Sequence, residues 1–296
     1  MFGLLLLLDV VLLIYGIVTS MLHTAALIIL AVLLLPLLWF WASEPRVSNK
    51  PDFTPLKNWF YAHRGYHTQD QSIPENSLAA FGLAVENGFG IELDVHLTKD
   101  GRLAVFHDDS LSRMCGTDVG IEDLDSDEVK KFRLKGTNEQ IPFFSEVLQM
   151  VDSKIPMIIE VKTHGGNSSA LCERLCKELE EYNGAYCVES FDPRAIRWFK
   201  KFFPSVVRGQ LAMAMHRYGK RKIFGFLLSN CLLNFMTKPD FIAYCHDDRK
   251  NLGLRFCKQF YGVQEFSWTV RTPDVARKLQ KSGALLIFEY FDPRKL

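Results

Sequence analysis

The distribution of apolar residues divides the chain into two segments. Residues 1–43 contain a single charged side chain, Asp9, whereas the rest of the chain carries all 35 basic residues and the other 33 acidic ones. Two apolar runs, residues 1–20 and 24–42, each have about the length of one membrane-spanning helix, ~20 residues. Because the link at residues 21–23 is so short, the pattern predicts a transmembrane helical hairpin, a two-span anchor over residues 1–43.

The residues around the two runs predict the orientation of this anchor. Trp39 and Trp41 lie at the end of the second run, where an aromatic belt is expected. Arg46 and Lys50 follow, while residues 21–23 hold no Lys or Arg, so the positive-inside rule predicts a multi-pass cell-membrane protein whose larger part is cytoplasmic. Seven cysteines at irregular spacings fit free thiols in a reducing compartment. Alternatively, the first run is a cleaved signal peptide and the second a single anchor.

Beyond the apolar segment, the pattern predicts an α/β domain. Residues 44–57 contain three prolines and no periodicity, and we expect a linker there. From residue 58 to residue 296, short apolar runs alternate with amphipathic ones, which favours a distorted (β/α)8 TIM barrel. The turn at Lys99-Asp100-Gly101 predicts that the second and third strands pair antiparallel. The expected strands are Phe60–His63, Gly90–His96, Leu103–His107, Pro156–Lys162, Tyr186–Phe191, Arg208–Ala212, Asp240–Tyr244, Glu265–Val270 and Leu285–Tyr290.

Charged residues and histidines occur at the ends of several of these apolar strands. The residues in question are His63, Arg64, Glu92, Asp94, His107, Glu160 and Lys162. Because strand side chains alternate, Glu92 and Asp94 share one face, and so do Glu160 and Lys162. Three converging carboxylates suit a hard divalent cation, a Lys and an Arg suit a phosphate, and two histidines suit acid–base chemistry. The set predicts phosphodiester cleavage, and the net charge of +1 gives no electrostatic signature of nucleic-acid binding.

The sequence resembles the glycerophosphodiester phosphodiesterase family. The motifs that carry the resemblance are AHRG at 62–65, PENS at 74–77, IELDVHLTKDG at 91–101, VFHDD at 105–109, IPFFSEVL at 141–148 and IIEVK at 158–162, followed by the weaker ESF at 189–191 and WTV at 268–270. Residues 110–140 resemble the small inserted lobe of the family. The resemblance implies a distorted (β/α)8 barrel over residues 58–296.

The resemblance also implies roles for individual residues. Glu92, Asp94 and Glu160 would hold one divalent cation, Mg²⁺ or Ca²⁺, with Mn²⁺ as a third candidate. His63 and His107 would be the acid–base pair, with Arg64 and Lys162 on the phosphate and Glu75 and Trp268 contacting the substrate. The sequence leaves open which histidine is the acid, and whether a cyclic phosphate forms or water attacks directly.

Three functions remain compatible with the sequence. The first is metal-dependent hydrolysis of glycerophosphodiesters to glycerol 3-phosphate and an alcohol. The second is lysophospholipase D-type cleavage of membrane lysophospholipids, which the anchor favours, together with the basic and apolar segment 216–236 if that segment lies on the membrane. The third is a non-catalytic phospholipid-binding scaffold. Arg271 and Glu289 depart from the residues common in the family, which leaves the headgroup preference open.

Overall fold

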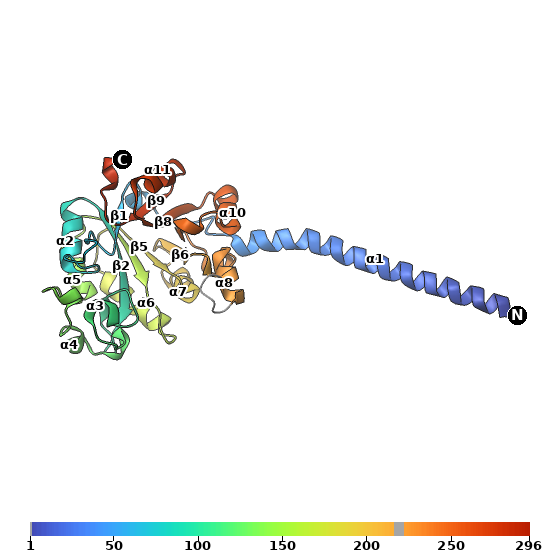
Figure 1. The fold of residues 1–296 in the computed structure, drawn as a ribbon, viewed down its shortest axis with the longest axis horizontal. Coiled ribbons are helices and arrows are strands. Elements are labelled where there is room, and N and C mark those ends of the chain that lie inside the picture. The colour runs from blue at the N-terminus through green and yellow to red at the C-terminus, as the bar shows by residue number, and fades with distance from the viewer. Residues whose placement is uncertain (1, 216–221) are drawn as a thin grey trace. The chain divides into compact units, whose positions relative to one another are not determined.

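The computed structural model describes residues 2–215 and 222–296, and these residues form two compact units that divide between Ala42 and Ser43 (Figure 1). In the second unit, eight parallel strands close into a barrel through the β1–β2 pairing, and β3 adds an antiparallel strand beside β2. The strands are β1 (Tyr61–His63), β2 (Gly90–Leu97), β3 (Leu103–Val105), β4 (Met157–Val161), β5 (Tyr186–Ser190), β6 (Arg208–Ala212), β7 (Phe241–Cys245), β8 (Gln264–Val270) and β9 (Leu285–Phe288). The predicted barrel and its antiparallel second and third strands are therefore confirmed.

Helices surround the barrel and follow the amphipathic patterns. Ser77 caps α2 by accepting a hydrogen bond from the Ala80 backbone N–H, and Asn251 caps α10 in the same way at Gly253. The longer helices are α2 (Leu78–Glu86), α5 (Phe144–Val151), α6 (Ser168–Leu179), α7 (Pro193–Phe202), α8 (Lys222–Ser229), α10 (Leu252–Tyr261) and α11 (Pro273–Lys281), with a short α9 (Asn234–Thr237) before β7. Residues 216–221, which begin the segment expected to touch a membrane, lie outside the described residues.

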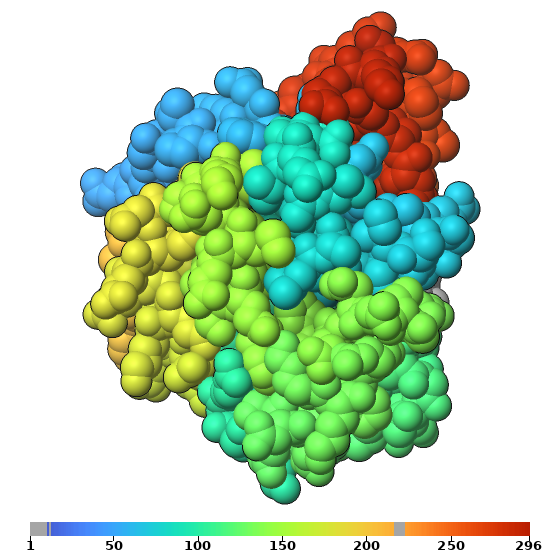
Figure 2. All heavy atoms as spheres, turned by 90° about the vertical axis from the view of Figure 1, so that its left-hand side faces the viewer, coloured from blue at the N-terminus to red at the C-terminus, as the bar shows by residue number. Residues whose placement is uncertain are grey.

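A small lobe leaves the barrel between β3 and α5. It contains the short helices α3 (Ser112–Cys115) and α4 (Ser126–Val129), and it appears as teal and green spheres at the lower edge of Figure 2. Leu111, Met114 and Ile121 belong to a buried apolar cluster that also includes Ala104 of β3. This lobe occupies the segment in which the sequence predicts an insertion, residues 110–140.

Inside the barrel, an apolar layer lies below a polar one. Tyr61, Phe241 and Phe266 pack in the lower layer, with ring centroids 4.5 Å apart for Phe241 and Phe266. Phe53 packs on the same rings, so the segment expected as a linker, residues 44–57, belongs to the same unit as the barrel. Two residues after Tyr61, Ile158 and Cys187, which belong to this layer, come the polar residues His63, Glu160 and Glu189, because alternate side chains on a strand share one face. This places the charged side chains at the carboxyl ends of the strands, where TIM-barrel sites lie.

The N-terminal apolar segment is one helix, and the predicted hairpin is wrong. Helix α1 runs without interruption from Phe2 to Ser43. Residues 21–23 contain neither Gly nor Pro, and the polar side chains near them bond within the helix. Thr24 Oγ1 donates to the Ser20 carbonyl at 2.9 Å, and His23 Nδ1 lies 2.7 Å from the Thr19 carbonyl oxygen. Leu13–Ser43 is the one stretch of the described chain long and apolar enough to cross a membrane, a test that an anchor and a signal sequence both meet.

Candidate active site

Three buried carboxyl groups meet at the carboxyl ends of β2 and β4. Asp94 pairs in register with Glu160 across these strands, and Glu92 precedes Asp94 by two residues on the same face. One oxygen from each of Glu92, Asp94 and Glu160 lies within 4.8 Å of the others. Burial and mutual repulsion raise the pKa of Glu92 and Glu160 above their ordinary values. Three hard oxygen donors that repel one another fit a divalent cation such as Mg²⁺, Ca²⁺ or Mn²⁺.

Two cationic side chains lie beside this cluster. Lys162 Nζ lies 3.0 Å from Asp94 Oδ1 and 2.9 Å from Glu160 Oε1. Arg64 Nε lies 3.7 Å from Asp94 Oδ2, and the Arg64 backbone N–H donates to Glu92 at 3.0 Å. Although burial raises the pKa of Asp94, the charges of Lys162 and Arg64 hold it well below its ordinary value. Lys162 and Arg64 also line the cavity above the cluster, as expected for side chains that bind a phosphate.

His63 lies at the end of β1 between two carboxyl groups. Its Nδ1 is 2.5 Å from Glu289 Oε1, and its Nε2 is 3.9 Å from Glu92 Oε2. Because an ionised carboxylate only accepts hydrogen bonds, Nδ1 carries the proton and Nε2 is free to accept one. Burial, together with the charge of Arg64, lowers the pKa of His63 to about 4, so the imidazole is neutral near pH 7.

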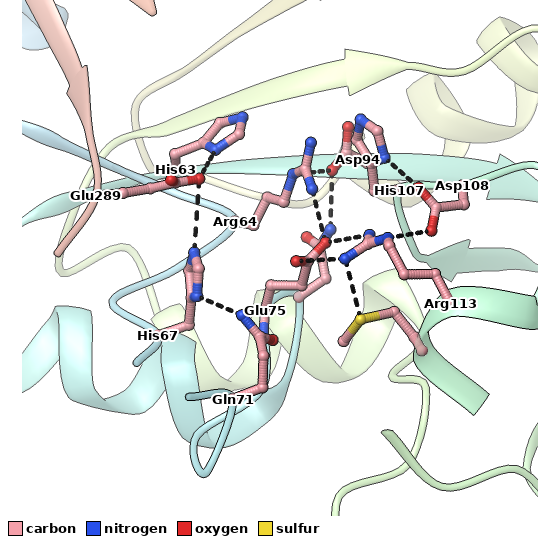
Figure 3. A network of polar contacts seen from close by, with 12 residues as sticks. His63, Arg64, His67, Gln71, Glu75, Asp94, His107, Asp108, Arg113 and Glu289 are labelled. Carbon is pink, nitrogen blue, oxygen red and sulfur yellow. Dashed lines mark hydrogen bonds and ion pairs between the residues drawn. The ribbon is translucent and has the colours of Figure 1, made fainter. Parts of the chain in front are cut away.

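His107 is held by a chain of hydrogen bonds and ion pairs that reaches the inserted lobe (Figure 3). Its Nδ1 donates to Asp108 at 2.7 Å, and Asp108 accepts from Arg113 Nε of α3 at 2.6 Å. Arg113 also donates to both oxygens of Glu75, at 2.7 and 2.9 Å, and Glu75 accepts from Arg64 Nη1 at 2.7 Å. Arg113 of the lobe therefore joins Asp108, the carboxyl group that holds His107, to Glu75, the carboxyl group that holds Arg64.

A cavity of about 280 Å³ opens above these groups. Its lining residues are His63, Arg64, Glu92, His107, Glu160, Lys162, Glu189, Phe191, Leu211, Met213, Cys245, His246, Asp247, Trp268, Thr269, Arg271 and Ile287. Trp268 meets Phe191 edge to face with centroids 5.7 Å apart, and both rings give the cavity an apolar wall. Two of the predicted site residues, Asp94 and Glu75, are not among the residues that line the cavity. Glu75 instead bonds Arg64 and Arg113.

Several residues of the site were not among the sequence predictions. Glu289 bonds His63 and also accepts from Arg271 Nε at 2.7 Å, so the two family departures at positions 271 and 289 contact each other and a catalytic candidate. Asn76 Nδ2 donates to Asp94 Oδ2 at 2.8 Å. Strand alternation from Ile287 places Glu289 on the inward face, a signal that the sequence contains. By contrast, no local pattern shows that Arg113 joins Asp108 to Glu75.

The pairing of Glu75 predicts a pH-dependent contribution to stability. Burial raises the pKa of Glu75, but hydrogen bonds and charge from Arg113 and Arg64 outweigh this and lower it from 4.5 to about 2. A carboxyl with a lowered folded-state pKa stabilises the fold above its unfolded pKa and loses this effect as the pH falls toward the folded value. The Glu75→Gln variant should therefore be less stable than the wild type by about 3 kcal/mol near pH 7.

This difference should shrink as the pH falls from about 4.5 toward 2, as urea unfolding at several pH values will measure. Glu86→Gln changes an exposed carboxyl on α2 and is the matched control, with little expected effect. A difference between Glu75→Gln and wild type that stays constant down to pH 3 would contradict the ion-pair account.

Comparison with known proteins agrees with the geometry. Residues 63–288 match the glycerophosphoryl diester phosphodiesterase family. A glycerophosphodiester phosphodiesterase of Caldanaerobacter subterraneus is 30% identical over 249 residues, which cover 77% of this chain and 92% of the relative. A human lysophospholipase D is 31% identical over 122 residues, covering 37% of this chain and 38% of the relative. A phosphodiesterase structure from Oleispira antarctica, in complex with the product sn-glycerol 3-phosphate, has the same fold, with a TM-score of 0.65 and 23% identity over 78% of this chain and 92% of that one.

Proposed function

The chain belongs to the glycerophosphoryl diester phosphodiesterase family, a family of hydrolases, and we propose that it cleaves glycerophosphodiesters to glycerol 3-phosphate and an alcohol with the help of a divalent cation. The observation that carries this proposal is the meeting of three carboxyl groups, two histidines and two cations at one cavity. A scaffold without catalysis would need phosphate contacts but neither of the supported histidines. Glu92, Asp94 and Glu160 would hold the cation, which when bound supplies positive charge to the phosphoryl oxygens.

The other side chains of the site bind the phosphate, transfer protons or hold neighbouring side chains in position. Arg64 and Lys162 bind the non-bridging phosphate oxygens, and their fixed ion pairs hold them in place. His63, neutral and with Nε2 free, accepts the proton of the nucleophile, which is either water or the neighbouring glycerol hydroxyl; in the second case water then opens the cyclic phosphate to glycerol 3-phosphate. His107 donates a proton to the oxygen of the leaving alcohol as the phosphorus–oxygen bond breaks, and Asp108 stabilises the protonated imidazole. Glu289, Glu75 and Arg113 act as positioning residues, and Trp268 packs against the carbon atoms of the substrate.

Hydrolysis of glycerophosphocholine tests this proposal. The purified full chain should release glycerol 3-phosphate in the presence of Mg²⁺, Ca²⁺ or Mn²⁺, measured by a coupled dehydrogenase assay. Addition of EDTA should stop the release, and excess cation should restore it. Turnover that is equally fast in EDTA would contradict the role of the three carboxyl groups.

A second candidate function is cleavage of lysophospholipids at a membrane. Three side chains of α8, Ile223, Phe224 and Phe226, are exposed, and Phe224 lines a surface hollow together with Glu160 and Lys162 of the site. An exposed apolar helix face at the mouth of a phosphodiesterase site suits an acyl chain or a lipid surface. Rates on lysophosphatidylcholine and glycerophosphocholine decide between the two, because a lipid-adapted site should have the higher kcat/KM on the former.

We further propose that α1 anchors the chain to the cell membrane as a single span. Arg46 and Lys50 follow the helix, so the positive-inside rule predicts that the catalytic unit is on the cytoplasmic side. Protease treatment of intact spheroplasts should leave the catalytic unit uncut if this orientation holds. A chain released into the medium without α1 would instead identify the helix as a signal sequence.

A further inference from the structure

Glu189 is a buried carboxyl group at the cavity for which the mechanism has no use. It lies on β5 opposite Glu160 of β4, with the same inward orientation, and only 2% of it is exposed. It lines the cavity beside Phe191, and its Oε2 has no hydrogen-bond partner within the part of the chain that the structure describes. Burying an unsatisfied carboxyl is costly, so an apolar residue at this position would give a more stable barrel. This cost is offset if a group of the bound substrate forms a hydrogen bond with Glu189.

Two other roles for Glu189 fit the structure poorly. The cluster whose carboxyl oxygens approach one another within 4.8 Å consists of Glu92, Asp94 and Glu160 and does not include Glu189. No ion pair joins Glu189 to a cation among the described residues, since Lys162 is bonded to Asp94 and Glu160. Glu189 is therefore neither a member of the cation cluster nor part of a salt bridge that closes the barrel.

Its position relative to the phosphate contacts defines the ligand that it can meet. Lys162 follows Glu160 on β4, the strand next to β5, so a phosphate bound by Lys162 lies close to the cavity wall that holds Glu189. An ionised carboxylate is repelled by the phosphate, whereas a carboxyl oxygen accepts a hydrogen bond from a neutral hydroxyl in either protonation state. In a glycerophosphodiester, the hydroxyl groups of glycerol are the donors nearest to the phosphorus. A cationic headgroup belongs to the leaving alcohol, on the far side of the phosphorus from the glycerol, whereas Glu189 is buried beside Glu160 of the cation cluster.

We propose that Glu189 accepts a hydrogen bond from a hydroxyl of the glycerol moiety and thereby selects glycerol-containing phosphates. This inference rests on the proposed function and adds a specificity-determining residue to it. Loss of one partner of a buried hydrogen bond corresponds to roughly a tenfold to hundredfold change in affinity. A site built to bind a hydroxyl also discriminates strongly against an analogue that lacks it.

Binding of two phosphomonoesters tests the proposal without requiring turnover. Calorimetry in the presence of Ca²⁺ would compare sn-glycerol 3-phosphate with propyl phosphate, which has the same carbon chain without hydroxyls. In the wild type, glycerol 3-phosphate should bind more tightly. In Glu189→Leu, the ratio of the two Kd values should fall by about tenfold to hundredfold. Asp247→Asn changes the other carboxyl that lines the cavity outside the cation cluster and should leave the ratio unchanged.

The alternative outcomes are distinct. Equal changes in both Kd values would assign Glu189 a general electrostatic role and overturn the proposal, as would an unchanged ratio. A weaker Kd for Ca²⁺ alone in Glu189→Leu would make it a cation ligand and overturn it too. Thermal unfolding of each variant checks that it is folded, and Glu189→Gln, which keeps the shape and one oxygen, should give an intermediate ratio. If the proposed function is wrong, the wild type itself will not hydrolyse glycerophosphocholine, whereas failure of this inference leaves an active wild type.

Discussion

Replacement of His63 by alanine should lower kcat for glycerophosphodiester hydrolysis by about 10²- to 10⁴-fold, the usual contribution of a general acid or base. The imidazole lies at the cavity with Nδ1 held by Glu289, so Nε2 is the one ring atom available to a proton. Its pKa, lowered to about 4 by burial, keeps it neutral and able to accept that proton near pH 7. KM should change little, because Arg64 and Lys162 keep their phosphate contacts.

His67→Ala is the matched control for this experiment. His67 Nε2 lies 3.7 Å from the same Glu289 oxygen, but His67 is not among the residues that line the cavity. It should reduce kcat by less than about tenfold, since it supports a positioning residue without touching the reacting atoms. Equal losses for His63→Ala and His67→Ala would show that the shared Glu289 network, and not proton transfer by His63, accounts for the effect.

Glu160→Gln should raise the Kd for the divalent cation and lower kcat/KM by about 10³-fold, because one of three anionic oxygen donors is lost. The substitution keeps the size of the side chain, and calorimetric titration with Mg²⁺, Ca²⁺ and Mn²⁺ will measure the affinity directly. Excess cation should restore part of the activity.

Asp274→Asn removes an exposed carboxyl from α11 and provides the control for Glu160→Gln. It should change neither cation affinity nor activity. If Glu160→Gln were to bind the cation as tightly as the wild type, then Glu92, Asp94 and Glu160 would not form the cation site. Loss of activity with unchanged cation affinity would then assign Glu160 to holding Lys162.

The order of strands and helices could be predicted from the sequence because each apolar run is bounded by a turn or a helix cap. The nine expected strands appear at nearly the expected residues. His63, Glu92 and Glu160 line the same cavity because alternate side chains on each strand point inward. The predicted hairpin at residues 21–23 was wrong, because the pattern of apolar residues does not distinguish a turn from a continuous helix at this point. A short link without Gly or Pro is compatible with a continuous helix, since the flanking Thr19 and Thr24 bond to carbonyls within it.

The supports of the two histidines depend on contacts between distant parts of the chain. Glu289 reaches His63 across 226 positions of the sequence, and Arg113 reaches Glu75 from a separate lobe across 38. Such pairs form when the barrel closes and when the lobe packs against it. Local periodicity in the sequence does not predict these long-range contacts. The reacting groups were therefore easier to predict than the residues that hold them.

The most direct test of the central claim is to identify the products formed from glycerophosphocholine. The purified full chain with a divalent cation would be followed by ³¹P nuclear magnetic resonance together with an assay for free choline. The account predicts that the diester signal is replaced by that of glycerol 3-phosphate, with one choline released for each phosphomonoester formed. Formation of phosphocholine and glycerol, or an unchanged diester signal in the presence of bound cation, would contradict it.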